Sequence, residues 1–278
     1  MKRFIDANYH SHTYRCGHAQ GSDEEYVVAA IENGFKILGV TDHIFLPNIS
    51  QRGMRGDFSE LKGYVVSLEK LREKYKDKIE LHIGFEAEWY GERYKDYYEW
   101  LLKTGVVEYL ILGNHMTIIS KSEDDDTPVA LNYGAMKDEK LATKMYVDSL
   151  IEGMESGLFT YVAHPDFFHY WYGEWDEYIE KESKRIIDAA IRLDIPLEIN
   201  MGPSRFLKNG IKEDELIYPW NKFWDLVANT KAKCICGVDA HNPNNYYETD
   251  YGFFKQFIAK RKLNLIKRVD LVNPFKNK

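Results

Sequence analysis

The chain has 278 residues, of which 44% are hydrophobic, and it carries a formal net charge of -7 with an isoelectric point near 5.8. This acidic balance argues against a protein that mainly binds nucleic acid, because phosphates call for a basic surface. No run of about 20 apolar residues exists to span a membrane, and the first residues lack the apolar stretch of a signal peptide, so we expect a cytoplasmic protein.

Short β-rich segments alternate with longer amphipathic ones along the chain. We predict seven strands, at residues 4–10, 36–43, 79–88, 108–115, 160–164, 195–200 and 233–241. The apolar spacing predicts helices at residues 23–34, 58–75, 91–105, 139–157, 176–193, 220–230 and 253–263, with Ser22 and Asp23 as candidate caps of the first.

Strands that alternate with helices of about 10 residues or more indicate βαβ units and a mostly parallel sheet. In closed form such a sheet is an α/β barrel, and an open doubly wound sheet is the alternative. No low-complexity linker or internal repeat divides the chain, so we expect one domain over residues 1–278. Four irregular stretches follow predicted strands, at residues 44–57, 120–128, 166–175 and 201–219. In a barrel they would lie on the side where active sites are built.

The histidines are distributed unevenly with respect to the predicted strands. Parallel strands bring their C-terminal ends to one rim, so residues far apart in the sequence can converge there on a single pocket. Seven of the nine histidines sit at or just beyond such an end: His10, His12, His18, His43, His115, His164 and His241. The pattern predicts a metal site at this rim of the barrel.

Carboxylates accompany the histidines at positions that suit shared ions. Alternate residues of a strand point to the same face, so Asp239 and His241 can aim two ligands into one pocket, as His10 and His12 can. Glu86 supplies a carboxylate on a third strand that can bridge two ions. Glu88 points the same way and is the competing choice for this role.

Imidazole with carboxylate and without thiolate suits zinc, iron(II) or manganese. More than one ion is needed to use so many ligands, and we expect two to three divalent ions.

Other conspicuous residues are assigned no part in the metal site. We expect the acidic run at residues 123–126 to be a solvated loop and the basic segment 259–268 to be the outer face of the last helix. The others are buried small cysteines, a mid-strand histidine and a histidine in an aromatic loop: Cys16, Cys234, Cys236, His82 and His169.

With these residues laid out, the sequence resembles the PHP (polymerase and histidinol phosphatase) superfamily, and within it the histidinol-phosphate phosphatases of the PHP type. Single motifs of this kind are weak, but here an ordered set runs from one end of the chain to the other. The motifs are H-S-H at His10 to His12, C-G-H ending at His18, T-D-H ending at His43, G-F-E at Glu86, G-N-H at His115, A-H-P at His164 and D-A-H at Asp239 to His241.

The resemblance implies a distorted (β/α)7 barrel with a trinuclear metal centre at the C-terminal rim of the strands. It implies one ion on His10, His12, Glu86 and Asp239, and a second that shares Glu86 and adds His115 and His164. The third ion would take His18, His43 and His241. Every ligand position that can be aligned is filled, so we expect an intact site whose catalysis depends on Glu86, Asp239 and His241.

Three ions suggest phosphoester hydrolysis by a metal-activated hydroxide, with a further ion to neutralise the leaving alkoxide. Arg205 lies where these phosphatases tend to carry a phosphate-contacting arginine, although the spacing of M-G-P-S-R departs from the pattern and a solvent-exposed loop arginine is the alternative. Arg55 is a weaker candidate for substrate binding. Asp42 and Asp166 each neighbour a ligand histidine and are expected to orient it.

We therefore predict a phosphoric monoester hydrolase that acts on a small phosphorylated substrate, L-histidinol phosphate in histidine biosynthesis. One alternative is a PHP-type exonuclease or phosphodiesterase, which the acidic balance and the lack of a basic and aromatic groove disfavour. The other is a metal-binding module without catalysis. The sequence does not indicate the oligomeric state.

Overall fold

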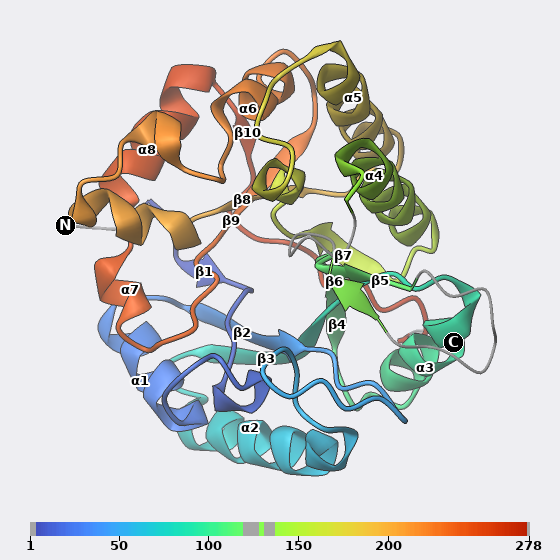
Figure 1. Cartoon of the computed structure of the whole chain (residues 1–278). Helices are drawn as coiled ribbons and strands as arrows, with labels where there is room; N and C mark the ends of the chain where they lie inside the picture. The colour runs from blue at the N-terminus through green and yellow to red at the C-terminus, as the bar shows by residue number, and fades with distance from the viewer. Residues whose placement is uncertain (1–3, 119–127, 131–136, 277–278) are drawn as a thin grey trace.

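In the computed structural model of the protein, residues 4–118, 128–130 and 137–276 are described. Their main feature is a sheet of parallel strands ringed by helices (Figure 1). The strands are hydrogen-bonded in the order β1 (Ala7–Asn8), β2 (Ile37–His43), β3 (Glu80–Ala87), β4 (Tyr109–Leu112), β7 (Phe159–Val162), β8 (Leu197–Asn200), β9 (Lys233–Gly237) and β10 (Asn264–Leu265). The seven predicted strands are confirmed, and β10 is an eighth.

Contacts between the first and the last predicted strands close the sheet at its carboxyl end. Ser11 and Ala240 form a parallel bridge, and the His12 amide donates to the Ala240 carbonyl at 2.8 Å. Nearby, the Val238 amide donates to Oδ1 of Asn8 at 2.8 Å. β10 pairs instead with the beginning of β9. The structure is therefore the predicted distorted barrel and not an open doubly wound sheet.

The outer layer consists of α1 (Asp23–Glu32), α2 (Leu61–Tyr75), α3 (Glu92–Lys103), α4 (Glu139–Glu155), α5 (Glu177–Arg192), α6 (Asn221–Val227), α7 (Asn245–Glu248) and α8 (Tyr251–Arg261). All seven predicted helices are present, with ends that differ by up to three residues. Ser22 caps α1, because its side chain accepts from the Glu25 amide while Glu25 accepts from the Ser22 amide.

Three small elements differ from the prediction. The short helix α7 was not predicted, nor was the hairpin of β5 (Met116–Thr117) and β6 (Val129–Ala130). The basic segment 259–268 was wrongly predicted as helical throughout, since α8 ends at Arg261 and the chain continues into β10. The predicted acidic loop at residues 123–126 lies outside the described residues.

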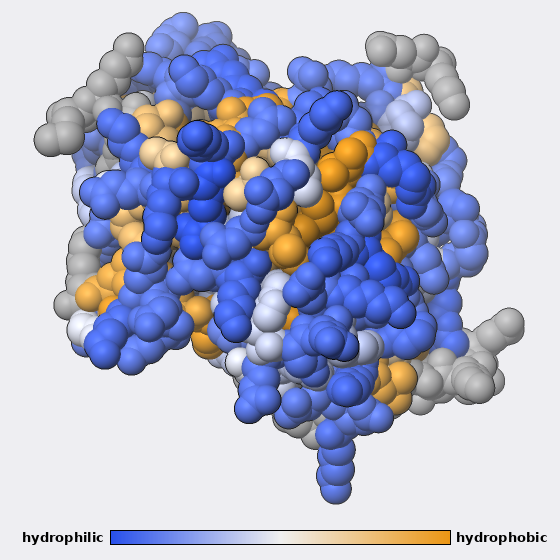
Figure 2. Space-filling model, turned by 90° about the horizontal axis from the view of Figure 1, so that it is seen from above, coloured by the Kyte–Doolittle hydropathy of each residue, from blue (hydrophilic) through white to orange (hydrophobic). Residues whose placement is uncertain are grey.

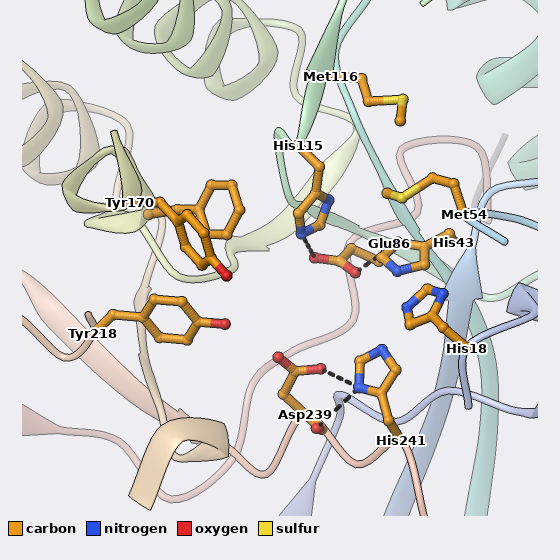
Figure 3. Close-up of a pocket in the computed structure, with 11 residues that line it drawn as sticks. His18, His43, Met54, Glu86, His115, Met116, Tyr170, Tyr218, Asp239 and His241 are labelled. Atoms are coloured by element: carbon orange, nitrogen blue, oxygen red, sulfur yellow. Dashed lines mark hydrogen bonds and ion pairs between the residues drawn. The ribbon is translucent and has the colours of Figure 1, made fainter. Parts of the chain in front are cut away.

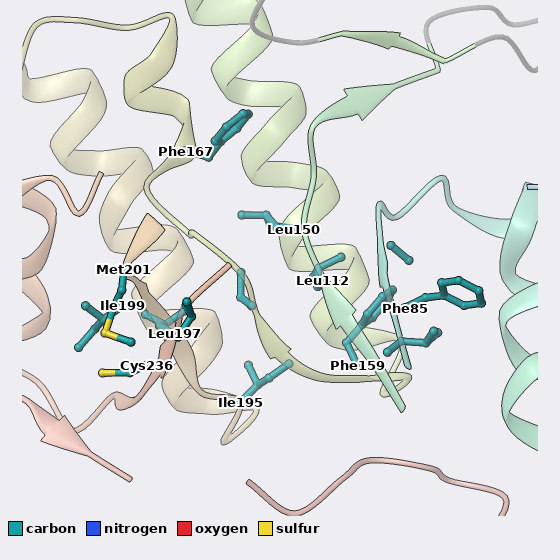
Figure 4. Packing of buried hydrophobic residues seen from close by; sticks show 14 of the residues in the cluster. Phe85, Leu112, Leu150, Phe159, Phe167, Ile195, Leu197, Ile199, Met201 and Cys236 are labelled. Atoms are coloured by element: carbon teal, nitrogen blue, oxygen red, sulfur yellow. The ribbon is translucent and has the colours of Figure 1, made fainter. Parts of the chain in front are cut away.

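Two apolar clusters stabilise the barrel. The larger one fills the space between the sheet and the helices, where Leu112 of β4 lies near Leu150 of α4 (Figure 4). The smaller one lies within the ring of strands and is closed by residues from the C-terminal segment. Its members are Ala7, Tyr9, Ile37, Tyr109, Ile111, Tyr161, Ala163 and Ile235, with Ile266, Val269 and Leu271 packed against them. The barrel interior below the carboxyl ends is therefore filled by packed, buried side chains.

The surface is largely polar. In the view of Figure 2, hydrophilic residues cover most of the face, with apolar residues gathered in patches between them. Within the described part of the chain, none of the helices combines the length and the apolar character that crossing a membrane requires.

The packing inside the barrel predicts that a larger residue at Gly39 destabilises the fold. A Cβ at Gly39 would overlap the Tyr109 hydroxyl and lie 2.9 Å from the Tyr9 Cα, whereas Gly63 in α2 has nothing within 4 Å of such an atom. We expect Gly39→Ala to lower the free energy of unfolding by about 1–3 kcal/mol because it overpacks the interior. Gly63→Ala should instead raise it by up to about 1 kcal/mol through helix propensity.

Urea denaturation of both variants measures these changes. Equal stability of Gly39→Ala and the unaltered protein would contradict the packing described for the barrel interior.

Candidate metal centre

The structure brings the predicted ligands together at the carboxyl ends of the strands. His43 ends β2 and Glu86 lies near the end of β3, while the other ligands lie in the loops that follow β1, β4, β7 and β9. Figure 3 shows His18, His43, His115 and His241 pointing toward a space that Glu86 and Asp239 also face. Of the predicted metal ligands, all but His18, His115 and His241 are buried. Residues from six strands, or from the loops that follow them, thus meet at one site.

The spacing of the innermost group is that of ligands around a shared ion. Nε2 of His10 lies 3.4 Å from Glu86 Oε2 and 3.5 Å from Asp239 Oδ1. Nε2 of His12 lies 3.4 Å from the same Glu86 oxygen and 3.3 Å from the same Asp239 oxygen. Two ligands that each lie about 2.1 Å from a tetrahedral ion are about 3.4 Å apart. These four imidazole–carboxylate distances are those expected between ligands of one ion, and His10, His12 and Glu86 also have ligand atoms that all lie within 4.8 Å of one another.

The second carboxylate oxygen of Glu86 faces two further imidazoles. Its Oε1 lies 2.8 Å from Nε2 of His164 and 3.7 Å from Nε2 of His115. His43 also approaches Glu86, with Nδ1 3.1 Å from Oε2. Glu86, rather than Glu88, is thus the carboxylate that touches histidines on both sides.

A third group lies at the open end of the pocket. Ligand atoms of His18, His43 and His241 all lie within 4.8 Å of one another. His43 also forms such a group with Glu86 and His115, so it stands within reach of two positions. Nδ1 of His18 faces the carbonyls of Cys16 and Gly53 at 3.2 and 3.1 Å, which leaves Nε2 for the pocket.

Cys16 lies beside this group. Its sulfur is within 4.8 Å of ligand atoms of His12 and His241. The side chain is fully buried, and burial raises the pKa of its thiol to about 12. Its burial agrees with the expectation of a packed small residue.

The chemistry of the buried atoms fits a metal centre. Within the described residues, the facing atoms of His10, His12, His43, Glu86 and Asp239 have no hydrogen-bond partner, which is costly for buried polar groups. Burial lowers the pKa of His12 to about 3 and that of His43 well below its ordinary value. Both imidazoles are therefore neutral at neutral pH, with lone pairs free for an ion.

Glu86 itself is held as a carboxylate. Burial works to raise its pKa, but the neighbouring imidazoles, first those of His115 and His10, outweigh burial and hold the pKa well below its ordinary range. Room for the side chain comes from Gly113, where a Cβ would overlap Glu86 Oε1. The backbone is also unusual beside the cluster, since His164 and Asp239 have φ angles of 30° and 50°. Such strain concentrates at functional sites.

Glu198 orients the cluster and was missed by the sequence analysis. One of its carboxylate oxygens lies 2.8 Å from Nδ1 of His10, and the other accepts from the His164 amide at 3.1 Å. Asn200 links Glu198 to Asp239 by donating to both, at 3.0 and 3.1 Å. The available signal was a carboxylate between the apolar Leu197 and Ile199 of the predicted strand at residues 195–200.

The predicted orienting roles of Asp42 and Asp166 were wrong. Asp42 accepts from the Thr13 amide at 2.5 Å and from the Thr13 hydroxyl, and so fixes the loop after β1. Asp166 accepts from the Trp220 amide at 2.5 Å and from the Trp224 indole at 3.0 Å. Neither carboxylate makes a hydrogen bond to an imidazole in the described structure.

Arg55 does not face the pocket, contrary to the prediction that it binds substrate. Its buried guanidinium is paired with both oxygens of Glu88, at 2.8 and 3.0 Å. The remaining donors go to Gln51, the Ile44 carbonyl and the Tyr90 hydroxyl. All donors are used, so Arg55 holds Glu88, which lies 3.8 Å from Nδ1 of His115.

Arg205 lies at the edge of the metal pocket, in the 3-10 helix η4 (Gly202–Asn209). Its guanidinium donates to the carbonyls of Val238 and Asp239 at 3.2 and 3.4 Å. Tyr170 and Tyr218, which the sequence analysis also missed, form the wall opposite the histidines, and their hydroxyls point into the cavity (Figure 3).

The two histidines that were left out of the metal shell lie apart from it. His82 contacts Glu108 and Glu80 at 2.8 and 3.0 Å. His169 stacks on Trp220 with ring centroids 3.7 Å apart, and its Nδ1 donates to the Ile217 carbonyl.

This chain is similar to known proteins both in sequence and in structure. A Deinococcus radiodurans protein named "Probable histidinol-phosphatase" is 27% identical over 166 residues, which are 56% of this chain and 59% of that relative's length. The crystal structure of histidinol phosphate phosphatase from Lactococcus lactis with zinc, L-histidinol and phosphate has a TM-score of 0.68 at 16% identity, and covers 96% of this chain and 99% of its own.

A candidate histidinol phosphatase from Listeria monocytogenes has a TM-score of 0.65 at 20% identity, and covers 86% of this chain and 96% of its own. At these identities the structural matches establish the fold.

The sequence profile of the PHP domain matches residues 8–202, which is well over half of the chain. That segment contains the histidines of β1 to β7 together with Glu86 and Glu198. By this match, the chain belongs to the PHP domain family.

Proposed function

We propose that the protein is a metal-dependent phosphomonoesterase that hydrolyses L-histidinol phosphate to L-histidinol and phosphate. The observation that carries the proposal is the spacing of 3.3 to 3.5 Å between the His10 and His12 nitrogens and the oxygens of Glu86 and Asp239. In the described structure these buried atoms have no hydrogen-bond partners, and one divalent ion would satisfy all of them.

The other residues would hold the remaining ions of a two- or three-metal centre. Glu86 would bridge the first ion to a second on His115 and His164, and His18, His43 and His241 would take a third. Bound ions of this kind supply Lewis-acid stabilisation of the phosphoryl oxygens and activate a water for attack on phosphorus. Zinc, iron(II) and manganese all suit the donor set.

Arg205 supports a phosphate monoester as the substrate. Its side chain is largely buried, and burial lowers the pKa of its guanidinium. Among the described residues no carboxylate lies within ion-pair distance of it, and its two contacts are to carbonyls at 3.2 and 3.4 Å. A cation in this position beside the metal pocket suits the terminal dianion of a monoester.

The substrate is proposed from the names of similar proteins. The Deinococcus relative is named as a histidinol-phosphatase, and the Lactococcus structure contains L-histidinol and phosphate. The net charge of -7 speaks against the alternative of a nuclease, because it would repel a polynucleotide.

The donor set predicts the metal content. We expect the purified protein to carry two to three equivalents of zinc, iron or manganese by elemental analysis, because the facing imidazoles and carboxylates exceed the needs of one ion. Removal of the metal with a chelator should abolish phosphatase activity. A metal-free preparation that keeps full activity would refute the proposed mechanism.

Substitutions of Glu86 in β3 and of Glu88 in the loop after it should have opposite effects on metal content and on stability. We expect Glu86→Gln to lose metal and activity, because a neutral amide cannot bridge two cations, while the protein stays folded. Glu88→Gln should keep its metal but lower the free energy of unfolding by about 3 kcal/mol, because it leaves the buried Arg55 without a charged partner. Metal analysis and urea denaturation of both variants separate these outcomes, and equal metal loss in both would mean that Glu86 is not the bridge.

Substitution of Arg205 tests whether the protein is a monoesterase or a nuclease. We expect Arg205→Ala to cost about 1.5–3 kcal/mol, or roughly ten- to a hundredfold in kcat/KM for histidinol phosphate, without loss of metal. Arg205→Lys should recover only part, because an ammonium lacks the bidentate geometry. Arg192→Ala on α5 is the matched control, since Arg192 pairs with Glu155 at the surface.

The same variants should be assayed with bis-p-nitrophenyl phosphate. If Arg205→Ala impairs this diester as severely as the monoester, the arginine does not recognise a terminal phosphate.

A further inference from the structure

Two tyrosines line the metal pocket without a place in the ligand set. In the proposed function, the imidazole and carboxylate atoms that face the pocket hold ions, and such atoms carry no proton. The described residues of the pocket lining that are not assigned to an ion are Met54, Met116, Phe167, Tyr170 and Tyr218. Of these five, the two tyrosines are the side chains with a proton on oxygen that can be donated.

The tyrosines lie on the side of the pocket toward which an alcohol would leave. They form the wall opposite the histidines, with their hydroxyls pointing into the cavity (Figure 3). Both also line a second cavity, of about 430 Å³, which adjoins the metal pocket. In phosphoryl transfer the attacking and the leaving oxygens lie roughly in line, on opposite sides of phosphorus. A water that attacks from the side of the histidines therefore expels the alcohol oxygen toward the tyrosines.

Tyr218 is the better placed of the two. Its ring lies beside the ligand His164, with ring centroids 5.9 Å apart, and the side chain is partly buried. Tyr170 is 43% exposed. In the described structure the Tyr218 hydroxyl makes no hydrogen bond, so its proton is available to a bound molecule.

The backbone around Tyr218 is held on both sides by the loop after β7. The Trp220 amide donates to Asp166 at 2.5 Å. On the other side, Nδ1 of His169 donates to the Ile217 carbonyl at 2.6 Å. The hydroxyl is therefore positioned by contacts of its neighbours and not by a hydrogen bond of its own, as a group that acts on a substrate must be.

We propose that Tyr218 is a catalytic residue whose hydroxyl donates its proton to the alcohol oxygen of the phosphomonoester. The proposal rests on the proposed function and goes beyond it by naming the proton donor. The oxygen of the attacking water bonds to phosphorus, and the bond between phosphorus and the alcohol oxygen breaks. The electron pair of the broken bond stays on the alcohol oxygen, which takes the Tyr218 proton. The tyrosinate recovers a proton from solvent, which receives the one that the attacking water gives up.

This role differs from the expectation that a further ion neutralises the leaving alkoxide. A proton donor accelerates the departure of an alkoxide, which is strongly basic, and contributes little to the departure of a stable anion such as p-nitrophenolate. An ion that did this work alone would make the Tyr218 hydroxyl dispensable for both. The dependence of the rate on the leaving group therefore separates the two arrangements.

Two esters of similar size test the role of the hydroxyl. We would measure kcat/KM of the zinc-loaded protein and of Tyr218→Phe for benzyl phosphate, which releases an alcohol, and for p-nitrophenyl phosphate, which releases a stable phenolate. We expect Tyr218→Phe to lose about a hundred- to ten-thousandfold with benzyl phosphate, the range for general acid catalysis, and less than about tenfold with p-nitrophenyl phosphate. Histidinol phosphate should follow benzyl phosphate.

Measurements without turnover separate this role from a structural one. Tyr218→Phe should keep its metal content by elemental analysis and its affinity for inorganic phosphate by calorimetry, because the hydroxyl is assigned to the leaving alcohol. The variant lacks one hydroxyl that has no hydrogen bond in the described structure, so it should fold. Tyr170→Phe is the matched control and should not change the ratio of the two rates.

The outcomes distinguish the proton donor from the proposed function. Equal losses with both esters, no loss with either, loss of metal or of phosphate affinity, or the same selective loss in Tyr170→Phe would each overturn the role of Tyr218. If the unaltered protein hydrolyses both esters but not histidinol phosphate, the proposed substrate is refuted, and a selective loss in Tyr218→Phe still supports the proton donor. An unaltered protein that hydrolyses no phosphomonoester would refute both.

Discussion

The structure depends on one arrangement: a buried carboxylate, Glu86, surrounded by imidazoles, with one oxygen hydrogen-bonded to His164 and the other without a hydrogen-bond partner among the described residues. Its two oxygens face histidines from β1, β2, β4 and β7 at distances from 2.8 to 3.7 Å. A buried cluster of polar atoms without partners is unfavourable unless something satisfies them. Bound divalent ions would make the free energy of this cluster favourable, because each ion would satisfy several of these atoms together.

Other parts of the fold act to keep this arrangement in place. Gly113 leaves room for the Glu86 side chain, and Glu198 holds the ring of His10 from behind. Arg55 and Glu88 neutralise one another beneath His115, so no unpaired charge lies behind the ligands. The packed cluster inside the barrel, around Tyr109, supports the site from below. The same contacts therefore stabilise the fold and hold the ligands in position.

The sequence predicted the barrel and the ligands because both follow from local patterns. Strand and helix periodicity placed the carboxyl ends of the strands, and His164 or Asp239 could then be located at the rim without knowing any contact. Side-chain partners across the barrel do not follow from such patterns. Glu198 is one residue in a strand of apolar neighbours, and its contact with His10 joins positions 188 residues apart. Arg55 was misjudged for the same reason, since its partner Glu88 lies 33 residues away.

The loops were the least predictable part. Most of the residues that line the cavity beside the metal pocket come from residues 201–219, whose 3-10 turns have no periodic apolar spacing. Tyr218 therefore gave no signal in the sequence, although it faces Asp239 and His241 across both cavities. The hairpin of β5 and β6 has two-residue strands, which are too short for alternation to reveal.

The most direct measurement is the position of the ions themselves. Crystals of the zinc-loaded protein, with diffraction data collected on both sides of the zinc absorption edge, would locate each ion by its anomalous signal. The account predicts one ion between His10, His12, Glu86 and Asp239 and a second on the other oxygen of Glu86, near His115 and His164. A protein that takes up zinc elsewhere, with no anomalous peak beside Glu86, would contradict it.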